Sequence, residues 1–330
     1  MHRRSLFALG SATLGAATLA TPALAFPDKA ITLATGYAPG GSTDIAARLL
    51  AERLSAHLGS GARVVVENRA GAAGIVASEW LKRQAPDGHT IMLVESSSHA
   101  IAPAALVGGT RYHPITDFSH LGVIGTAPLI LVLNNSFPAQ TAAEVVQKLR
   151  SAPPDTYTYA TSGVGTIPHL ATELLAKDLG TSFVHVPYRS GGQMLTAIFT
   201  NEAQFGIAVL ASAANQVRGG LARGIALTGE QRFPSFPETP TLAEAGVPGY
   251  DLETWNILLG PPGMPTEVQA ALNQALRAAL AEPETRDKLL TAGVRAWQQP
   301  NGPTEARGFL EREVAKFRAV VDRTGIKLEG

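Results

Sequence analysis

The segment Tyr37–Asp44, which reads YAPGGSTD, decides how the rest of this sequence is interpreted. The apolar run of residues 30–34 before it is typical of a short buried strand, and apolar residues recur at helical spacing in residues 45–54 after it. We therefore predict a strand, a glycine-rich turn and a helix that starts near Ser42. The unpaired N–H groups of such a helix start attract anions, although the same residues also serve as an ordinary helix cap.

The composition is that of a globular chain with about two domains. It gives no indication of a highly charged macromolecular partner. Of its 330 residues, 45% are hydrophobic and 16% are charged. Lys+Arg and Asp+Glu number 27 each, which argues against a surface for nucleic acid or anionic lipid. Cysteine is absent, and the eight histidines have no H-x-x-x-H or H-E-x-x-H spacing, so we expect no disulfide, no metal and no cofactor.

Residues 1–25 are predicted to be a cleavable signal peptide. A positive start at His2–Arg4 precedes the apolar stretch Leu6–Ala20, and Ala23–Ala25 forms an A-x-A cleavage site. The stretch is short and broken by serine and threonine, which argues against a membrane anchor. The expected mature chain starts at Phe26 in a bacterial periplasm, and the paired arginines are compatible with twin-arginine export.

Three strand–loop–helix units follow one another in the first part of the mature chain. After the strand at 30–34, further strands are expected at residues 62–66 and 90–94, each followed by a polar or glycine-rich loop. Such units imply parallel strands, and ligands of open parallel sheets lie beyond the carboxyl ends of the strands. Tyr37 on the first loop and Ser97 and Ser98 on the third are therefore candidate ligand contacts.

The second part of the chain repeats this architecture and then returns to the first sheet. A second glycine-rich turn occupies Thr161–His169, and Thr141–Glu144 matches a capping box. Two crossings, near residues 125 and 252, predict one lobe of residues 26–124 and 252–330 and another of residues 125–251. Further strands are expected at residues 121–124, 129–133, 156–160, 183–186, 205–209, 224–228 and 252–259, and helices at 194–199, 242–245, 266–280 (capped by Thr266), 284–292 and 304–324.

Six motifs occur in order along almost the whole mature chain. They are PGGSTD within Tyr37–Asp44, VVENRAG in Val65–Gly71, APDGHT in Ala85–Thr90, GVGTIPHL in Gly163–Leu170, VPYR in Val186–Arg189 and PTLAEAGVPGY in Pro240–Tyr250. Together they resemble the substrate-binding proteins of tripartite tricarboxylate transporters, also called Bug receptors. His89 stands where this family usually has a tyrosine.

The resemblance implies an α/β, type II periplasmic binding-protein fold, in which two α/β lobes joined by two crossing strands surround a central cleft. A receptor of this kind is a monomer that captures a small organic carboxylate and delivers it to the membrane permease subunits of its transporter. It is not an enzyme.

The resemblance also implies which residues contact the solute, and it does so through the two glycine-rich turns. Arg189 is a candidate partner for a second carboxylate, and Ala208 stands where many relatives have an acidic residue, which predicts a more apolar cleft wall. Selectivity is expected from the cleft walls, including His99, Tyr188 and Val209. The turn residues carried over are Ala38, Gly40, Gly41, Ser42, Thr43 and Asp44 from one lobe and Ser162, Gly163, Gly165, Thr166 and His169 from the other.

Other functions were weighed against this interpretation. Ser162, His169 and Asp44 form a Ser/His/Asp set on paper, but the sequence has no G-x-S-x-G elbow and the three residues fall in different lobes. A regulatory effector-binding domain would carry a helix-turn-helix where this chain carries the predicted signal peptide. A periplasmic sensor that reports to a two-component kinase stays open, as does the identity of the solute.

Overall fold

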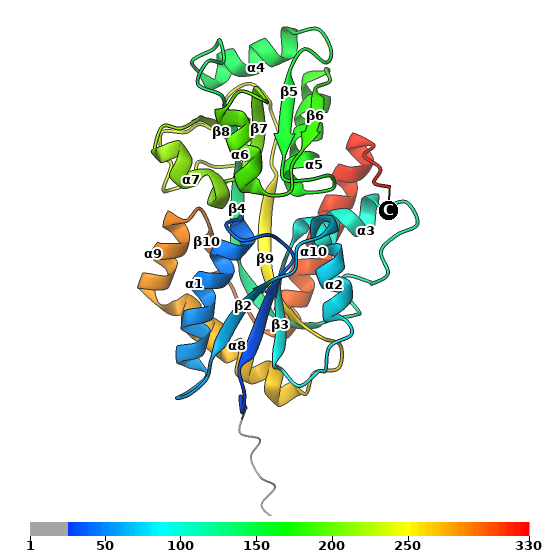
Figure 1. Ribbon diagram of the computed structural model, residues 1–330, viewed down its shortest axis with the longest axis vertical. Helices are drawn as coiled ribbons and strands as arrows, with labels where there is room; N and C mark the ends of the chain where they lie inside the picture. Colours follow the sequence, from blue (N-terminus) through cyan, green and yellow to red (C-terminus); the bar gives the residue numbers. More distant parts are fainter. Residues whose placement is uncertain (1–25, 330) are drawn as a thin grey trace, which may run out of the picture.

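The computed structural model describes residues 26–329, so the predicted signal peptide lies outside the described residues. The fold consists of two lobes stacked along the long axis of the molecule (Figure 1). The first lobe, at the bottom of this view, contains a sheet in the order β2-β1-β3-β9-β4. Its strands are β1 (Ile31–Thr35), β2 (Val64–Asn68), β3 (Thr90–Glu95), β9 (Glu253–Gly260) and the first part of β4 (Ser119–Leu133).

The second lobe, at the top, is built on the other end of β4. Strands β7 and β8 both run antiparallel to β4, while β5 pairs in parallel with β6 and β7. The bounds of these strands are β5 (Thr158–Thr161), β6 (Val184–Pro187), β7 (Phe205–Val209) and β8 (Arg223–Leu227).

Strand β4 is one continuous strand of 15 residues, and the prediction of two separate strands was wrong. Residues 125–128 have weak strand propensity, but β9 pairs with them up to Pro128, opposite Glu253. The short strand β10 (Arg295–Ala296), which was not predicted, pairs with Gly125 on the other side. A Cβ at Gly125 would lie 2.3 Å from the Arg295 carbonyl oxygen, so only glycine permits this approach. Tertiary pairing therefore outweighs local propensity here.

Helices cover both sheets (Figure 1). In the first lobe they are α1 (Ser42–His57), η1 (Ala72–Gly74), α2 (Ile75–Leu81), η2 (Ser97–Ile101, a π-helical turn), α3 (Ala102–Ala105), α8 (Thr266–Ala281), α9 (Pro283–Thr291) and α10 (Pro303–Thr324). In the second lobe they are α4 (Ala142–Ser151), α5 (Ile167–Leu179), α6 (Gly191–Phe199) and α7 (Leu210–Arg218). The predicted capping box at the start of α4 is confirmed, whereas η2, α3 and α7 were not predicted.

Two local predictions about helices were wrong. Residues 242–245 form a turn, in which Thr241 and Glu244 exchange hydrogen bonds and Gly246, at φ +103°, stops any continuation. Helix α8 begins at Thr266, which therefore does not cap it. The predicted helix start near Ser42 is confirmed, since Ser42 is the first residue of α1 and Gly41 occupies the cap position.

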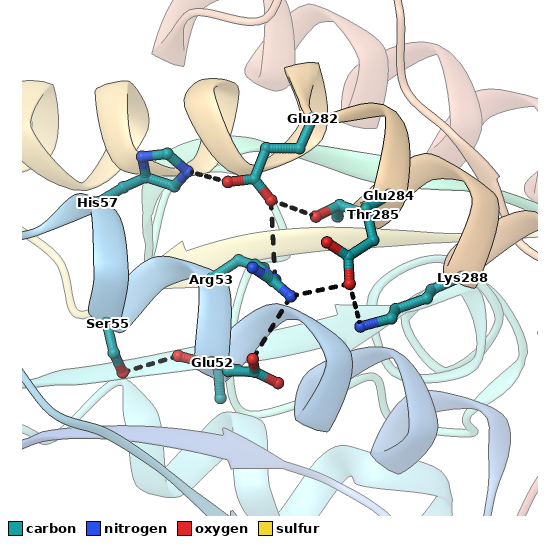
Figure 2. A network of polar contacts seen from close by, with 9 residues as sticks. Glu52, Arg53, Ser55, His57, Glu282, Glu284, Thr285 and Lys288 are labelled. Atoms are coloured by element: carbon teal, nitrogen blue, oxygen red, sulfur yellow. Dashed lines mark hydrogen bonds and ion pairs between the residues drawn. The ribbon is translucent and has the colours of Figure 1, made fainter.

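Helix α1 is held against α9 by a network of charged side chains at its C-terminal end (Figure 2). Arg53 pairs with Glu282 at 3.7 Å and with Glu284 at 3.3 Å, while His57 contacts Glu282 at 2.7 Å. Partly exposed ion pairs of this kind each contribute about 0–1 kcal/mol. Their main effect is to orient α1, whose other end reaches the cleft described below.

The described residues hold no helix with the length and apolar character that a membrane crossing requires. Side chains from both faces of the sheets instead form a hydrophobic core within the protein.

Candidate functional site: a cleft between the two lobes

A cavity lies between the lobes, at the carboxyl ends of β1 and β3 and opposite the starts of α5 and α6. The empty space between its lining atoms is about 540 Å³, a figure that includes open solvent, and the centres of water-sized spheres can occupy only about 40 Å³ of it. The first lobe lines it with Tyr37, Ala38, Gly41, Ser42, Thr43, Glu95 and Ser97. The second lobe contributes Ser162, Thr166, Ile167, Pro168, Arg189, Ser190, Gly191, Met194, Ala208, Val209 and Ser212.

Most of the residues predicted from the sequence meet in this lining. Those brought together are Tyr37, Ala38, Gly41, Ser42, Thr43, Ser97, Ser162, Thr166, Arg189 and Ala208. Those placed outside the lining are Gly40, Asp44, Ser98, Gly163, Gly165 and His169. Val209, expected as a cleft-wall residue, also belongs to the lining. Those that the sequence analysis did not select are Glu95, Ile167, Pro168, Ser190, Gly191, Met194 and Ser212.

Three helices begin at the cavity. Helix α1 starts at Ser42, α5 at Ile167 and α6 at Gly191, and all three residues belong to the lining. The first-turn N–H groups of a helix have no partner within the helix and carry partial positive charge. At α5 these groups already have partners or are missing, because the Ile167 N–H donates to Ser97, residue 168 is proline and the His169 N–H donates to the Thr166 carbonyl. The starts of α1 and α6 therefore offer N–H groups to a carboxylate or another small anion, and the start of α5 adds the positive end of its dipole.

Arg189 adds a full positive charge to this surface. It lies directly before the capping residue of α6, Ser190, whose hydroxyl accepts the Gln193 N–H at 3.2 Å. Within residues 26–329 the Arg189 guanidinium has no carboxylate within ion-pairing distance. Its charge is therefore available to a ligand.

Asp44 holds the first glycine-rich turn in shape and does not line the cavity. Its carboxylate accepts the Gly40 N–H at 2.9 Å, the Asn68 amide at 2.9 Å and the Arg48 guanidinium at 3.0 Å. Burial alone would raise the pKa of Asp44, but these hydrogen bonds and the charge of Arg48 outweigh it and lower the pKa. Gly40 and Asp44 thus stabilise the turn through their hydrogen bond, while other residues of the turn line the cavity.

In the second turn, too, some residues line the cavity and others hold the turn in shape. Thr166 lines the cavity and donates its hydroxyl to the Gly163 carbonyl at 2.7 Å, while the Gly165 N–H donates to Nδ1 of His169 at 3.2 Å. The His169 ring stacks on His185 with centroids 4.2 Å apart. Burial lowers the pKa of His169 to about 4, so the ring is neutral at pH 7 and can accept that hydrogen bond.

Ser98 and His99 point into the first lobe. The Ser98 hydroxyl donates to the backbone carbonyl of Glu95 at 3.3 Å and lies 3.0 Å from Nδ1 of His99. His99 is fully buried against Tyr112 and Phe118, and it does not form part of the cavity wall as the sequence suggested. The π-helical turn η2, which local sequence patterns do not reveal, turns these side chains away from the cleft.

Comparison with known proteins supplies the family. The profile described as "Tripartite tricarboxylate transporter family receptor" matches residues 46–326. The chain belongs to this receptor family. The resemblance inferred from the six motifs is thereby confirmed.

Solved structures similar to this receptor include R. palustris Rpa4515 with adipate, at 31% identity and a TM-score of 0.85, covering 92% of this chain and 99% of that one. MatC (Rpa3494) from Rhodopseudomonas palustris, with bound malate, is 28% identical with a TM-score of 0.82 and coverages of 90% and 100%. The periplasmic binding protein BugD is 25% identical with a TM-score of 0.85 and coverages of 92% and 100%. The family is one of periplasmic binding proteins, and the predicted two-lobed fold is confirmed.

One bond in this receptor crosses the cleft directly. The first N–H of α5, at Ile167, donates to the Ser97 hydroxyl oxygen at 2.9 Å. Ser97 belongs to the first lobe and Ile167 to the second, so a side chain of one lobe caps a helix of the other. The serine keeps its own hydroxyl proton, which it can donate to a ligand.

The floor of the cleft contains a buried carboxyl group, Glu95, at the end of β3. It accepts hydrogen bonds from the Tyr37 hydroxyl, the Ser97 N–H at 3.1 Å and the hydroxyls of Ser96 at 3.1 Å and Thr254 at 3.2 Å. Burial, followed by the charge of Glu95, raises the pKa of Tyr37 well above its usual value, so the phenol keeps its proton. The position of Glu95 just after a predicted strand was the one sequence signal that pointed to it.

The receptor fold does not assemble the Ser/His/Asp set considered above. Asp44 is bonded to Gly40, Arg48 and Asn68, and His169 is bonded to Gly165, so neither is directed at Ser162. In residues 26–329 there is also no group of His, Asp and Glu side chains arranged to hold a metal ion. The family and its structural neighbours are binding proteins.

Proposed function

We propose that this receptor captures a small organic carboxylate between its two lobes and delivers it to the membrane permease of a tripartite tricarboxylate-type transporter. The observation that carries the proposal is the convergence on one cavity of three helix N-termini and of Arg189, which has no ion-pair partner within residues 26–329. Adipate and malate in two of its structural neighbours support a carboxylated ligand.

The proposed mechanism is closure of the cleft about the strands β4 and β9. The lobes are taken to comprise residues 26–124 with 252–330, and residues 125–251. Solute binds to the N–H groups of one lobe, and the N–H groups of the other then favour the closed state because they contact the solute only there. The receptor would act as a monomer in the periplasm, after export by the predicted signal peptide of residues 1–25 through the general or the twin-arginine route.

A thermal-shift screen tests this function. Residues 26–330 would be mixed with mono-, di- and tricarboxylates and with neutral analogues of each. A carboxylate present at about 100 times its Kd stabilises the folded state by about 2.7 kcal/mol, which raises the melting temperature by several degrees. Stabilisation by the neutral analogues alone, or conversion of a compound into product, would contradict a carboxylate receptor.

Two substitutions then locate the site. Ser42→Leu and Thr166→Leu each place a bulky apolar side chain in the lining, one in each lobe. Both should abolish the calorimetric binding of a carboxylate found in the screen. Thr266→Leu, which changes the exposed first residue of α8 outside the cavity, is the matched control and should bind normally. Unchanged affinity in both cleft variants would place the solute elsewhere.

A further inference from the structure

The cavity contains one acidic and one basic side chain among the described residues that line it. Glu95 is on the first lobe and Arg189 is on the second. Glu95 is only 5% exposed and has no cationic group within ion-pairing distance in residues 26–329. The ligand space is therefore favourable for an anion at the helix starts and at Arg189, and unfavourable for one on its floor.

The position of the Glu95 carboxylate is determined by the protein itself. Its hydrogen bonds come from Tyr37 on the first turn, from Ser96 and Ser97 beside it, and from Thr254 on the crossing strand β9. All of these donors belong to the first lobe or to the crossing strand, so the carboxylate does not depend on the second lobe or on a solute for its place. A solute in the cleft meets a charge whose position is already set.

The second lobe faces this floor with an apolar wall. Met194 is buried on α6, while Ala208 and Val209 end β7, and all three belong to the lining. A wall of this kind contacts the carbon skeleton of a solute and leaves its polar ends to the helix starts and to the floor.

From this arrangement we infer that Glu95 selects solutes that carry one carboxylate and, at the other end, a hydrogen-bond donor without negative charge, such as an ammonium, amide or hydroxyl group. A second carboxylate placed against Glu95 would meet a like charge in a largely desolvated site, which disfavours it strongly. A donor would add a hydrogen bond to a charged acceptor instead. This inference rests on the proposed carboxylate-receptor function and narrows its substrate class, away from the dicarboxylates bound by the two neighbours named above.

Calorimetry on the wild-type receptor tests the inference without any variant. At chain lengths of four, five and six carbons, three compounds of equal length would be compared: the α,ω-dicarboxylate, its monoamide and the ω-amino acid. At the length that binds best, the amide or the amino acid should bind at least about tenfold more tightly than the dicarboxylate. A dicarboxylate that binds as tightly as both partners, or more tightly, would overturn the inference.

Glu95→Gln then assigns the preference to this residue. The substitution keeps the shape of the side chain and removes its charge, so the dicarboxylate should gain about tenfold in relative affinity. Glu305→Gln, at an exposed glutamate of α10 outside the cavity, should leave the ratio unchanged. An unchanged ratio in Glu95→Gln, with a melting curve that shows a folded protein, would overturn the assignment. If no carboxylate of any class stabilises the wild-type receptor, it is the proposed function itself that fails.

Discussion

Replacing Ser97 with alanine removes a hydrogen bond between the two lobes at the cavity, one of several polar contacts between them. The Ile167 N–H donates to the Ser97 hydroxyl at 2.9 Å, and this N–H is the first of α5. Without the hydroxyl, the N–H loses its partner in the closed arrangement, whereas in an open arrangement water can satisfy it. The substitution therefore destabilises the closed state and has little effect on the open one.

The size of the effect follows from comparable helix caps. Loss of a serine cap costs about 0.5–2 kcal/mol. In the proposed mechanism ligand binding is coupled to closure, so the same free energy is lost from binding and the Kd should rise about 2- to 30-fold. The loss of the bond to Ile167 should have the same size for every ligand of the series, and only the loss of a contact between the Ser97 hydroxyl and the ligand would add a part that differs among ligands.

Isothermal calorimetry with several carboxylates, together with small-angle X-ray scattering of the liganded protein, would measure both quantities. Ser78→Ala is a suitable control, because it removes a buried hydroxyl that donates within the first lobe to Gly74 at 2.9 Å. This control should lower the melting temperature and leave the affinity unchanged. A loss in Ser97→Ala that varies with the ligand would show that the serine acts by direct contact, and an unchanged Kd would refute the closing role of this bond.

Three further predictions concern the turns and the dependence of stability on pH. Gly165→Ala should destabilise the fold by about 1–2 kcal/mol, because φ is +77° at this residue and a Cβ would lie 2.7 Å from Leu328; a melting curve unchanged within a degree would contradict this. Asp44→Asn should cost about 1–3 kcal/mol in chemical denaturation, because it weakens the bond to the Gly40 N–H, and unaltered stability would mean that the turn holds itself in place. Burial, followed by the charge of His120, lowers the pKa of His99 from 6.5 to about 3, so the folded state binds fewer protons than the unfolded state and stability falls as the pH drops from 6.5 toward 3. At pH 5 this residue alone should account for about 2 kcal/mol of the loss, which His99→Phe should remove from the stability–pH curve; a curve of unchanged slope would show that the residue does not titrate in this way.

The local pattern of this chain was sufficient to find both glycine-rich turns and the elements around them. Strand β1, the start of α1 and the capping box of α4 agree with the sequence analysis, because each depends on residues close together in the chain. Turn residues that line the cavity, such as Ser42 and Thr166, were selected from the sequence for the same reason.

The sequence could not predict which residues of each turn line the cavity and which bond within the turn. Asp44 and His169 are polar residues in glycine-rich turns, as ligand contacts are, but each accepts an N–H of its own turn, from Gly40 and Gly165 respectively. Whether such a side chain faces the ligand or the turn depends on what packs behind it. For Asp44, which lies on α1, that neighbour is Asn68 at the end of β2.

The sequence by itself determined the family, the alternation of strands and helices, and the presence of two glycine-rich turns, because these properties depend on motifs and on local backbone preferences. Only the tertiary structure decided that three helix starts and Arg189 surround one cavity, that Ser97 joins the lobes, and that a carboxylate occupies the floor. Glu95 shows the physical reason: its partners Tyr37 and Thr254 lie 58 and 159 residues away in the chain. A charge held by groups so distant in sequence leaves no local pattern, and it becomes visible only when the strands that carry those groups lie side by side.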